Sequence, residues 1–226
     1  MKKLVFTFFI ALLAIPSALL AQENDNDTED FSRWQVRVRG VAVMPDPGAT
    51  IEAIGGDVDI SDSFIPELDF TYFFTENLAV ELILGTTKHE AHTVGSDLSP
   101  IGGGIADVDL GEVWLLPPTL NLQYHREVFE NFKPYIGAGV NYTIFYDADD
   151  FTTVKSVSYD NAFGISTQIG FDYMFTDKFF FNVDFKYIFL KTDVEVDASN
   201  LAENLSIPAE VEINPMLLGF GVGMKF

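Results

Sequence analysis

The last seven residues, Phe220-Gly-Val-Gly-Met-Lys-Phe226, alternate between large apolar side chains and small or polar ones. Phe220, Val222, Met224 and Phe226 would share one face of an extended strand, because successive side chains of a strand point to opposite sides. Two glycines and Lys225 would share the other face. A strand that is apolar outside, small or polar inside and terminated by an aromatic residue is typical of bacterial outer-membrane barrels.

The start of the chain predicts a cleavable secretory signal peptide over residues 1–21. Lys2 and Lys3 precede an apolar run over residues 4–13, and small residues end at Ala21. The alternative is a transmembrane anchor, but the run is shorter than the roughly 20 residues that a spanning helix needs. We therefore expect export from the cytoplasm.

The composition of the chain excludes some classes of partner. The chain has no cysteine, and its 13 basic and 34 acidic residues give a formal charge of −21. Such a charge repels nucleic acid, which we exclude as a partner. Residues 22–32 predict an acidic N-terminal leader, and residues 33–226 predict one barrel domain.

Period-two alternation continues through the rest of the chain and predicts eight strands. Their ranges are 33–45, 64–74, 78–88, 112–126, 132–147, 160–174, 179–193 and 211–226. Short turns are expected at 75–77, 127–131 and 176–178, and long loops at 46–63, 89–111, 148–159 and 194–210. Short turns at one end and long loops at the other predict an all-β fold: an eight-stranded antiparallel up-and-down transmembrane barrel with short periplasmic turns and long extracellular loops.

Charged side chains fall on the inward face of the predicted strands. We expect a polar plug formed by Arg37, Arg39, Glu67, Asp69, Glu81, Asp184 and Lys186. Opposite charges that can pair are what a buried polar interior requires, since unpaired buried charge is costly. For each of these residues, a purely structural role is the alternative.

Nearer the long loops the inward face becomes apolar. The residues expected to line an apolar pocket there are Val41, Val43, Ile83, Leu115, Phe145, Ile188, Leu190, Ile213 and Leu217. An apolar pocket above a polar floor suits a small hydrophobic ligand. The alternative is an apolar plug without free space.

Pro117 and Pro118 fall within a predicted strand of a closed barrel. Proline cannot donate a hydrogen bond to the neighbouring strand, so the pairing should be weakened there. The two residues predict a lateral exit from the lumen into the membrane. A simple bulge or an early strand end is the alternative.

Catalytic and metal-binding patterns are absent from the sequence. His89 and His92 are expected in a loop, without the helical spacing of a zinc motif. His125 is expected near a periplasmic turn, and no G-x-S-x-G elbow occurs. We therefore expect no enzyme activity, no cofactor and no metal site.

Several stretches resemble the OmpW family of small outer-membrane proteins. They are Phe70-Thr-Tyr-Phe-Phe-Thr-Glu-Asn-Leu-Ala-Val-Glu-Leu82, Leu116-Pro-Pro-Thr-Leu120, Lys133-Pro-Tyr-Ile-Gly-Ala-Gly-Val-Asn-Tyr-Thr-Ile-Phe-Tyr-Asp147 and the end from Gly219 to Phe226. The resemblance implies an eight-stranded barrel with a hydrophobic channel for small hydrophobic molecules, with lateral exit as one route.

Two functions remain open from the sequence, and a membrane enzyme is a third that the absence of catalytic patterns disfavours. The first is a narrow hydrophobic channel or pocket for passive passage of small hydrophobic molecules across the bacterial outer membrane. The second is a structural or adhesive barrel with a plugged lumen and acidic surface loops. The expected partners are outer-membrane lipid and lipopolysaccharide, small hydrophobic ligands, and the barrel-assembly machinery through Phe226.

Overall fold

The structure is a computed structural model that describes residues 32–51, 54–99, 102–149, 151–203 and 205–226. Fourteen strands fill these ranges. They are β1 (Trp34–Met44), β2 (Gly48–Thr50), β3 (Asp57–Ile60), β4 (Ser63–Phe73), β5 (Leu78–Gly85), β6 (Thr87–Asp97), β7 (Ile105–Leu116), β8 (Thr119–His125), β9 (Phe132–Asp149), β10 (Ser156–Tyr159), β11 (Ala162–Met174), β12 (Phe179–Asp197), β13 (Ser206–Glu212) and β14 (Met216–Lys225). Within the described residues, no helix has the length and apolar character needed to cross a membrane.

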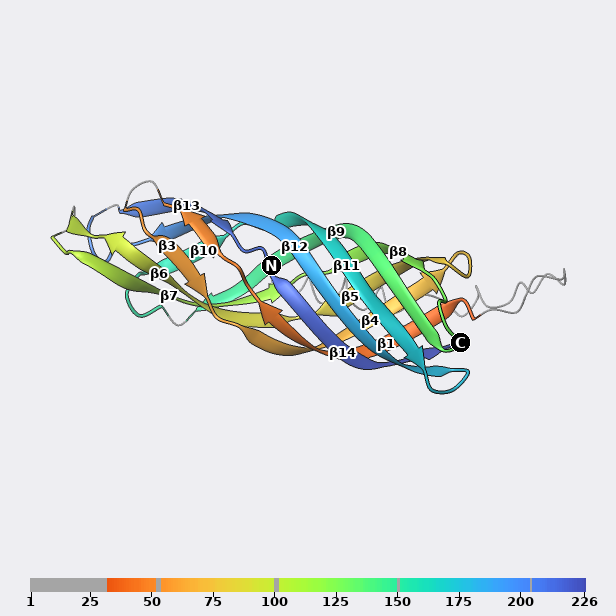
Figure 1. Cartoon of the computed structure of the whole chain (residues 1–226). Coiled ribbons are helices and arrows are strands. Elements are labelled where there is room, and N and C mark those ends of the chain that lie inside the picture. Colours follow the sequence, from red (N-terminus) through yellow and green to blue (C-terminus); the bar gives the residue numbers. More distant parts are fainter. Residues whose placement is uncertain (1–31, 52–53, 100–101, 150, 204) are drawn as a thin grey trace. The chain divides into compact units, whose positions relative to one another are not determined.

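The strands form a closed antiparallel barrel, which confirms the predicted fold class. Pairing runs from β1 through β4, β5, β8, β9, β11, β12 and β14, and β14 pairs with β1 again. We call these strands the ring (Figure 1). Backbone bonds between Trp34 and Phe226, at 3.1 Å and 2.9 Å, join the two ends of the ring.

The predicted division into eight strands and long loops is wrong in one respect. Much of 46–63, 89–111, 148–159 and 194–210 is strand rather than loop. Strands β2, β3, β6, β7, β10 and β13, with the ends of β9 and β12 that pair with them, continue the sheet beyond the ring. We call this part the extension; Figure 1 shows its strands gathered at one end of the barrel.

The extension has the reverse polarity of the ring. In β12, Phe181, Phe185 and Phe189 are exposed, and the charged side chains between them are buried. Further along the same strand, Val194 and Val196 are buried and the acidic residues point outward. The polar face of the extension is therefore outside and its apolar face is inside, as in a segment that water surrounds.

The short turns lie at the other end of the ring, as predicted. The Thr75 hydroxyl accepts hydrogen bonds from the backbone N–H groups of Asn77 and Leu78, at 3.3 Å and 3.0 Å, and Thr176 plays the same part in its turn. Residues 1–31, which hold the predicted signal peptide and nearly all of the predicted leader, lie outside the described residues.

Candidate functional site

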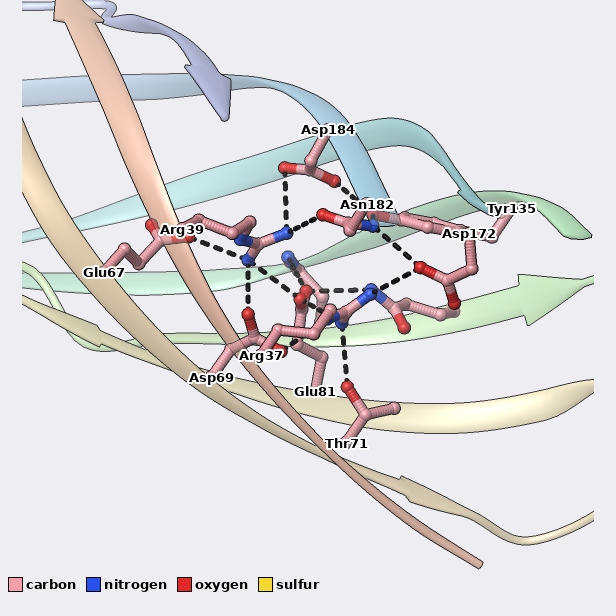
Figure 2. Close-up of polar contacts among 12 residues, drawn as sticks. Arg37, Arg39, Glu67, Asp69, Thr71, Glu81, Tyr135, Asp172, Asn182 and Asp184 are labelled. Carbon is pink, nitrogen blue, oxygen red and sulfur yellow. Dashed lines mark hydrogen bonds and ion pairs between the residues drawn. The ribbon is translucent and has the colours of Figure 1, made fainter. Parts of the chain in front are cut away.

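Two buried arginines occupy the centre of the ring. On Arg37, Nε donates to Asp69 at 2.6 Å, and Nη2 donates to Thr71 at 2.8 Å and to Glu81 at 2.5 Å. Figure 2 shows the guanidinium groups of Arg37 and Arg39 surrounded by carboxylates from several strands. Both arginines are almost completely buried.

Arg39 joins four acidic side chains in the same way. Its Nη2 lies 2.7 Å from Glu67, 3.0 Å from Asp69 and 3.1 Å from Glu81. Its Nη1 lies 3.6 Å from Asp184. One arginine therefore bridges β4, β5 and β12 across the lumen.

Glycines of β14 make room for these side chains. Gly221 faces Arg39 and Gly223 faces Arg37 in the β1–β14 register. A methyl group at either glycine would lie 2.7 Å from the arginine Cγ, closer than carbon atoms normally approach. The small inward positions noted at the end of the chain are thus the space that the arginines fill.

The remaining polar side chains complete this network. Lys186 binds Asp184, and its Nζ lies 3.5 Å from Glu67. Gln123 and Gln168 donate to Glu81 at 2.8 Å and 2.9 Å. The structure brings together all seven side chains of the expected plug: Arg37, Arg39, Glu67, Asp69, Glu81, Asp184 and Lys186. We call this network the floor.

The floor also contains residues outside the expected plug, and Tyr135 is one of them. The Tyr135 hydroxyl donates to Asp184 at 2.8 Å and accepts from Asn182 at 2.9 Å. Tyr135 is buried, whereas its neighbour Ile136 is exposed. The alternation of the strand could have identified Tyr135, because its apolar neighbour Ile136 faces outward and successive side chains point to opposite sides.

An apolar cavity of about 90 Å³ lies above the floor. Eight of the nine residues expected in an apolar pocket line it: Val43, Ile83, Leu115, Phe145, Ile188, Leu190, Ile213 and Leu217. The ninth, Val41, is fully buried in the adjoining core and does not line the cavity. Glu67 and Lys186 also line it, so the cavity reaches the floor.

A second cavity of about 200 Å³ lies within the extension, and Thr93 is the only polar residue among those described that line it. Four residues line both cavities: Val58, Leu110, Val194 and Val211. These four come from β3, β7, β12 and β13. We call them the junction, because they lie where one apolar chamber meets the next.

His89 lies on β6 and lines the first cavity, so the expectation that it belongs to a loop is wrong. Its Nδ1 lies 2.6 Å from the Ser61 carbonyl oxygen, and its Nε2 lies 2.9 Å from the Thr87 hydroxyl. A carbonyl can only accept, so Nδ1 carries the proton and Nε2 accepts from Thr87. Burial lowers the pKa of His89, so the imidazole is neutral in this apolar wall. His92 also lies on β6, where it approaches Asp59.

No group of three or more His, Cys, Asp or Glu side chains in the described ranges is arranged to hold a metal ion.

The wall beside the cavity is weakened at Pro117 and Pro118. The register continues across them, because residues 114–116 of β7 and all of β8 pair with β9 in the same register. The Tyr142 N–H donates to the Pro118 carbonyl at 3.0 Å, so Pro118 faces β9, and Pro117 faces the opposite neighbour. Since N–H groups alternate along a strand, the two prolines remove one donor on each side. Pro117 lines the cavity and Pro118 does not.

The pairing of β4 with β5 and β6 is also interrupted beside the first cavity. The β4–β5 ladder ends at Glu67 and Gly85, and Thr86 separates β5 from β6. Above that point β4 and β6 are joined through the Ser63 and Thr87 hydroxyls, which lie 2.6 Å apart. The wall beside the cavity is therefore tied partly by side chains rather than by a continuous ladder.

Comparison with known proteins gives a consistent picture. The model of the OmpW family matches residues 33–226. The chain is 40% identical to the outer-membrane protein y4mB of Sinorhizobium fredii, over 96% of this chain and 90% of that protein. It is 28% identical to outer membrane protein AlkL of Ectopseudomonas oleovorans, over 75% of this chain and 69% of AlkL.

Two further similarities come from Pseudomonas aeruginosa. The dibenzothiophene metabolism operon protein PahQ is 29% identical over 86% of this chain and 89% of PahQ. The crystal structure of the outer membrane protein OprG superposes with a TM-score of 0.76 at 26% identity, covering 87% of this chain and 96% of OprG.

Proposed function

The chain belongs to the OmpW family of outer-membrane proteins, and from that premise we propose that it is a passive conduit for small hydrophobic molecules. Such a molecule enters the extension, passes the junction into the cavity above the floor, and leaves sideways through the wall near Pro117 and Pro118. No chemical step is involved.

The observation that supports this proposal is the pair of apolar cavities in the extension and above the floor. Two cavities, of about 200 Å³ and about 90 Å³, share the four junction residues and lead from the extension to the floor. An apolar solute gains about 25 cal/mol for each Å² of its surface that leaves water, so the path favours its entry. The name of PahQ, which refers to dibenzothiophene metabolism, supports an apolar cargo.

The floor supports a lateral rather than an axial exit. Its side chains are buried and joined by ion pairs of 2.5–3.7 Å. Passage through it would separate these pairs in a low-dielectric interior, which costs several kcal/mol per ion. The wall beside Pro117 and Pro118 lacks one ladder donor on each side, so opening it there breaks fewer hydrogen bonds.

The cavities favour this proposal over a structural or adhesive barrel, because that alternative requires a plugged lumen. Lipid and lipopolysaccharide would contact the exposed apolar band of the ring, and the barrel-assembly machinery would recognise the strand that ends at Phe226.

Uptake of an apolar fluorescent tracer into lipid vesicles containing the protein tests the conduit. Leu115→Asp and Leu190→Asp each place a charge in the cavity wall and should reduce uptake about ten-fold or more, because a buried unpaired charge costs several kcal/mol. Ile105→Asp is the matched control, since Ile105 is 80% exposed on the extension. Unchanged uptake in both cavity variants, with normal barrel assembly, would overturn the conduit.

A further inference from the structure

We propose that the floor of the first cavity is a head-group site, which binds the hydroxyl of an amphiphilic molecule and rejects a carboxylate. This inference rests on the proposed conduit and specifies its ligand class. The apolar tail would occupy the cavity, and the hydroxyl would donate a hydrogen bond to Glu67.

Glu67 offers an acceptor at the base of an apolar chamber. The carboxylate is 4% exposed and lines the cavity. Arg39 and Lys186 both approach its Oε1, at 2.7 Å and 3.5 Å. Within the described part of the chain, no hydrogen bond reaches Oε2, so this oxygen can accept one from a ligand.

Most neighbouring donors are already engaged. Thr119 Oγ1 donates to the Pro117 carbonyl at 3.1 Å, and Thr143 Oγ1 donates to Asn141 Oδ1 at 2.7 Å. Lys186 directs two of its three N–H donors to Asp184 and Glu67. The polar atoms that line the lower cavity therefore offer mainly acceptors, which suits a ligand that donates.

The charge of the floor also opposes an anionic ligand. Three cations, Arg37, Arg39 and Lys186, are joined to five carboxylates, those of Glu67, Asp69, Glu81, Asp172 and Asp184. Lys225, whose Nζ lies 5.8 Å from the centre of the Phe180 ring, adds a fourth cation and still leaves one carboxylate in excess. Across the cavity His89 is neutral. A ligand carboxylate at this position would lie against the like charge of Glu67, which repels it.

Competition binding to the barrel in lipid nanodiscs tests the site. Decanol, decanoate and decane would displace a fluorescent apolar probe at a pH where decanoate is ionised. We expect decanol to bind about ten-fold more tightly than decanoate after correction for partition into lipid, because the hydroxyl of decanol can donate a hydrogen bond to Glu67 and ionised decanoate has no proton to donate. Equal binding of decanol and decanoate would overturn the head-group site.

Two variants shift this preference in opposite directions. Glu67→Gln keeps the side-chain shape, removes a negative charge and adds a donor, so the preference for decanol should fall toward one. Lys186→Met removes a cation and should increase the preference. Glu210→Gln is the control, because Glu210 is exposed and paired with Lys191 on the extension. A preference that stays unchanged in both floor variants would also overturn the site.

The outcomes separate the two proposals. Displacement by decane and decanol with no head-group preference would preserve the conduit and refute the head-group site. Failure of all three molecules to displace the probe would refute both. If a floor variant does not assemble, the binding of decanol, decanoate and decane to the wild-type barrel still tests the head-group site.

Discussion

At the scale of single residues, the floor concentrates charge where solvent is absent. Arg37 and Arg39 are each within ion-pair distance of at least three carboxylates. Burying an ion pair has a desolvation free energy that the attraction between the charges only partly offsets. The main effect of the network is therefore to close the floor, and its contribution to stability is small. Removing one partner of a buried ion pair, by contrast, destabilises the protein, because the remaining charges stay buried without an opposite charge.

Arg39→Met should therefore destabilise the barrel by about 3–5 kcal/mol, since it leaves Glu67 and Asp184 with fewer positive partners. Lys155→Met should cost about 0–1 kcal/mol, because an exposed ion pair contributes little. Lys155 pairs with Asp197 at 3.0 Å, and the two side chains are 60% and 37% exposed. Urea unfolding from lipid vesicles measures both losses, and similar values for the two variants would contradict the argument.

Tyr159 gives a pH dependence outside the membrane-spanning ring. Its ring stacks on Phe145 with centroids 5.4 Å apart, and burial raises the pKa of Tyr159 to about 12. In the unfolded chain the pKa of tyrosine is about 10, so only the unfolded state ionises between these values. The contribution to stability is complete below about pH 10 and is lost as the pH rises toward about 12.

Comparison with Tyr159→Phe isolates this effect, because phenylalanine does not titrate. Wild type should lose about 2 kcal/mol more unfolding free energy than the variant between about pH 9 and about pH 12. Parallel pH profiles for the two proteins would show that the Tyr159 hydroxyl is not held in a buried environment.

At the scale of elements, the sequence predicts the strands of the ring well. Their period of two is strong because lipid and lumen impose opposite polarity on the two faces. The extension was missed because its strands have the opposite polarity and are rich in residues typical of loops. Val58 between Asp57 and Asp59 is an example: the alternation is present, but the buried residue is the apolar one.

The proline pair makes a prediction about one strand. Pro117→Val restores an N–H that can donate across the wall, a hydrogen bond that contributes about 0.5–1.5 kcal/mol. If an apolar molecule leaves by opening this part of the wall, its transfer into lipid should slow about two- to ten-fold. Transfer from the cavity to an acceptor in the bilayer can be followed by fluorescence quenching.

Pro208→Val serves as the control for that experiment, since Pro208 lies in β13 on the extension, opposite Glu195. It should leave the transfer rate unchanged. A rate in Pro117→Val equal to that of wild type, with binding intact, would place the exit elsewhere, and the β4–β6 seam at Ser63 and Thr87 would be tested next.

At the scale of the whole molecule, the barrel is two tubes of opposite polarity joined end to end. The ring is apolar outside and polar inside, whereas the extension is polar outside and apolar inside. The sequence predicted the apolar side chains of the first cavity because they lie on ring strands or directly beyond them. It did not predict the second cavity or the junction, since these depend on which strands of the extension face one another.

The junction should limit the size of what passes between the chambers. Val194 and Val211 come from β12 and β13, and Val58 and Leu110 come from β3 and β7, so apolar side chains meet from two strand groups. Val194→Phe adds volume at this point and should cost about 1–3 kcal/mol through overpacking. Entry of a rigid polycyclic tracer should fall about ten-fold or more, whereas a linear alkane of similar hydrophobicity should enter with a smaller loss.

Val196→Phe provides the comparison, because Val196 lines only the larger chamber of about 200 Å³. The same side chain is added two residues away, but there the chamber has room for it, so both tracers should enter nearly as in wild type. Selective loss of the polycyclic tracer in Val194→Phe alone would locate the size limit at the junction. Equal loss of both tracers in the two variants would mean that the chambers respond as one space, and that no constriction separates the extension from the ring.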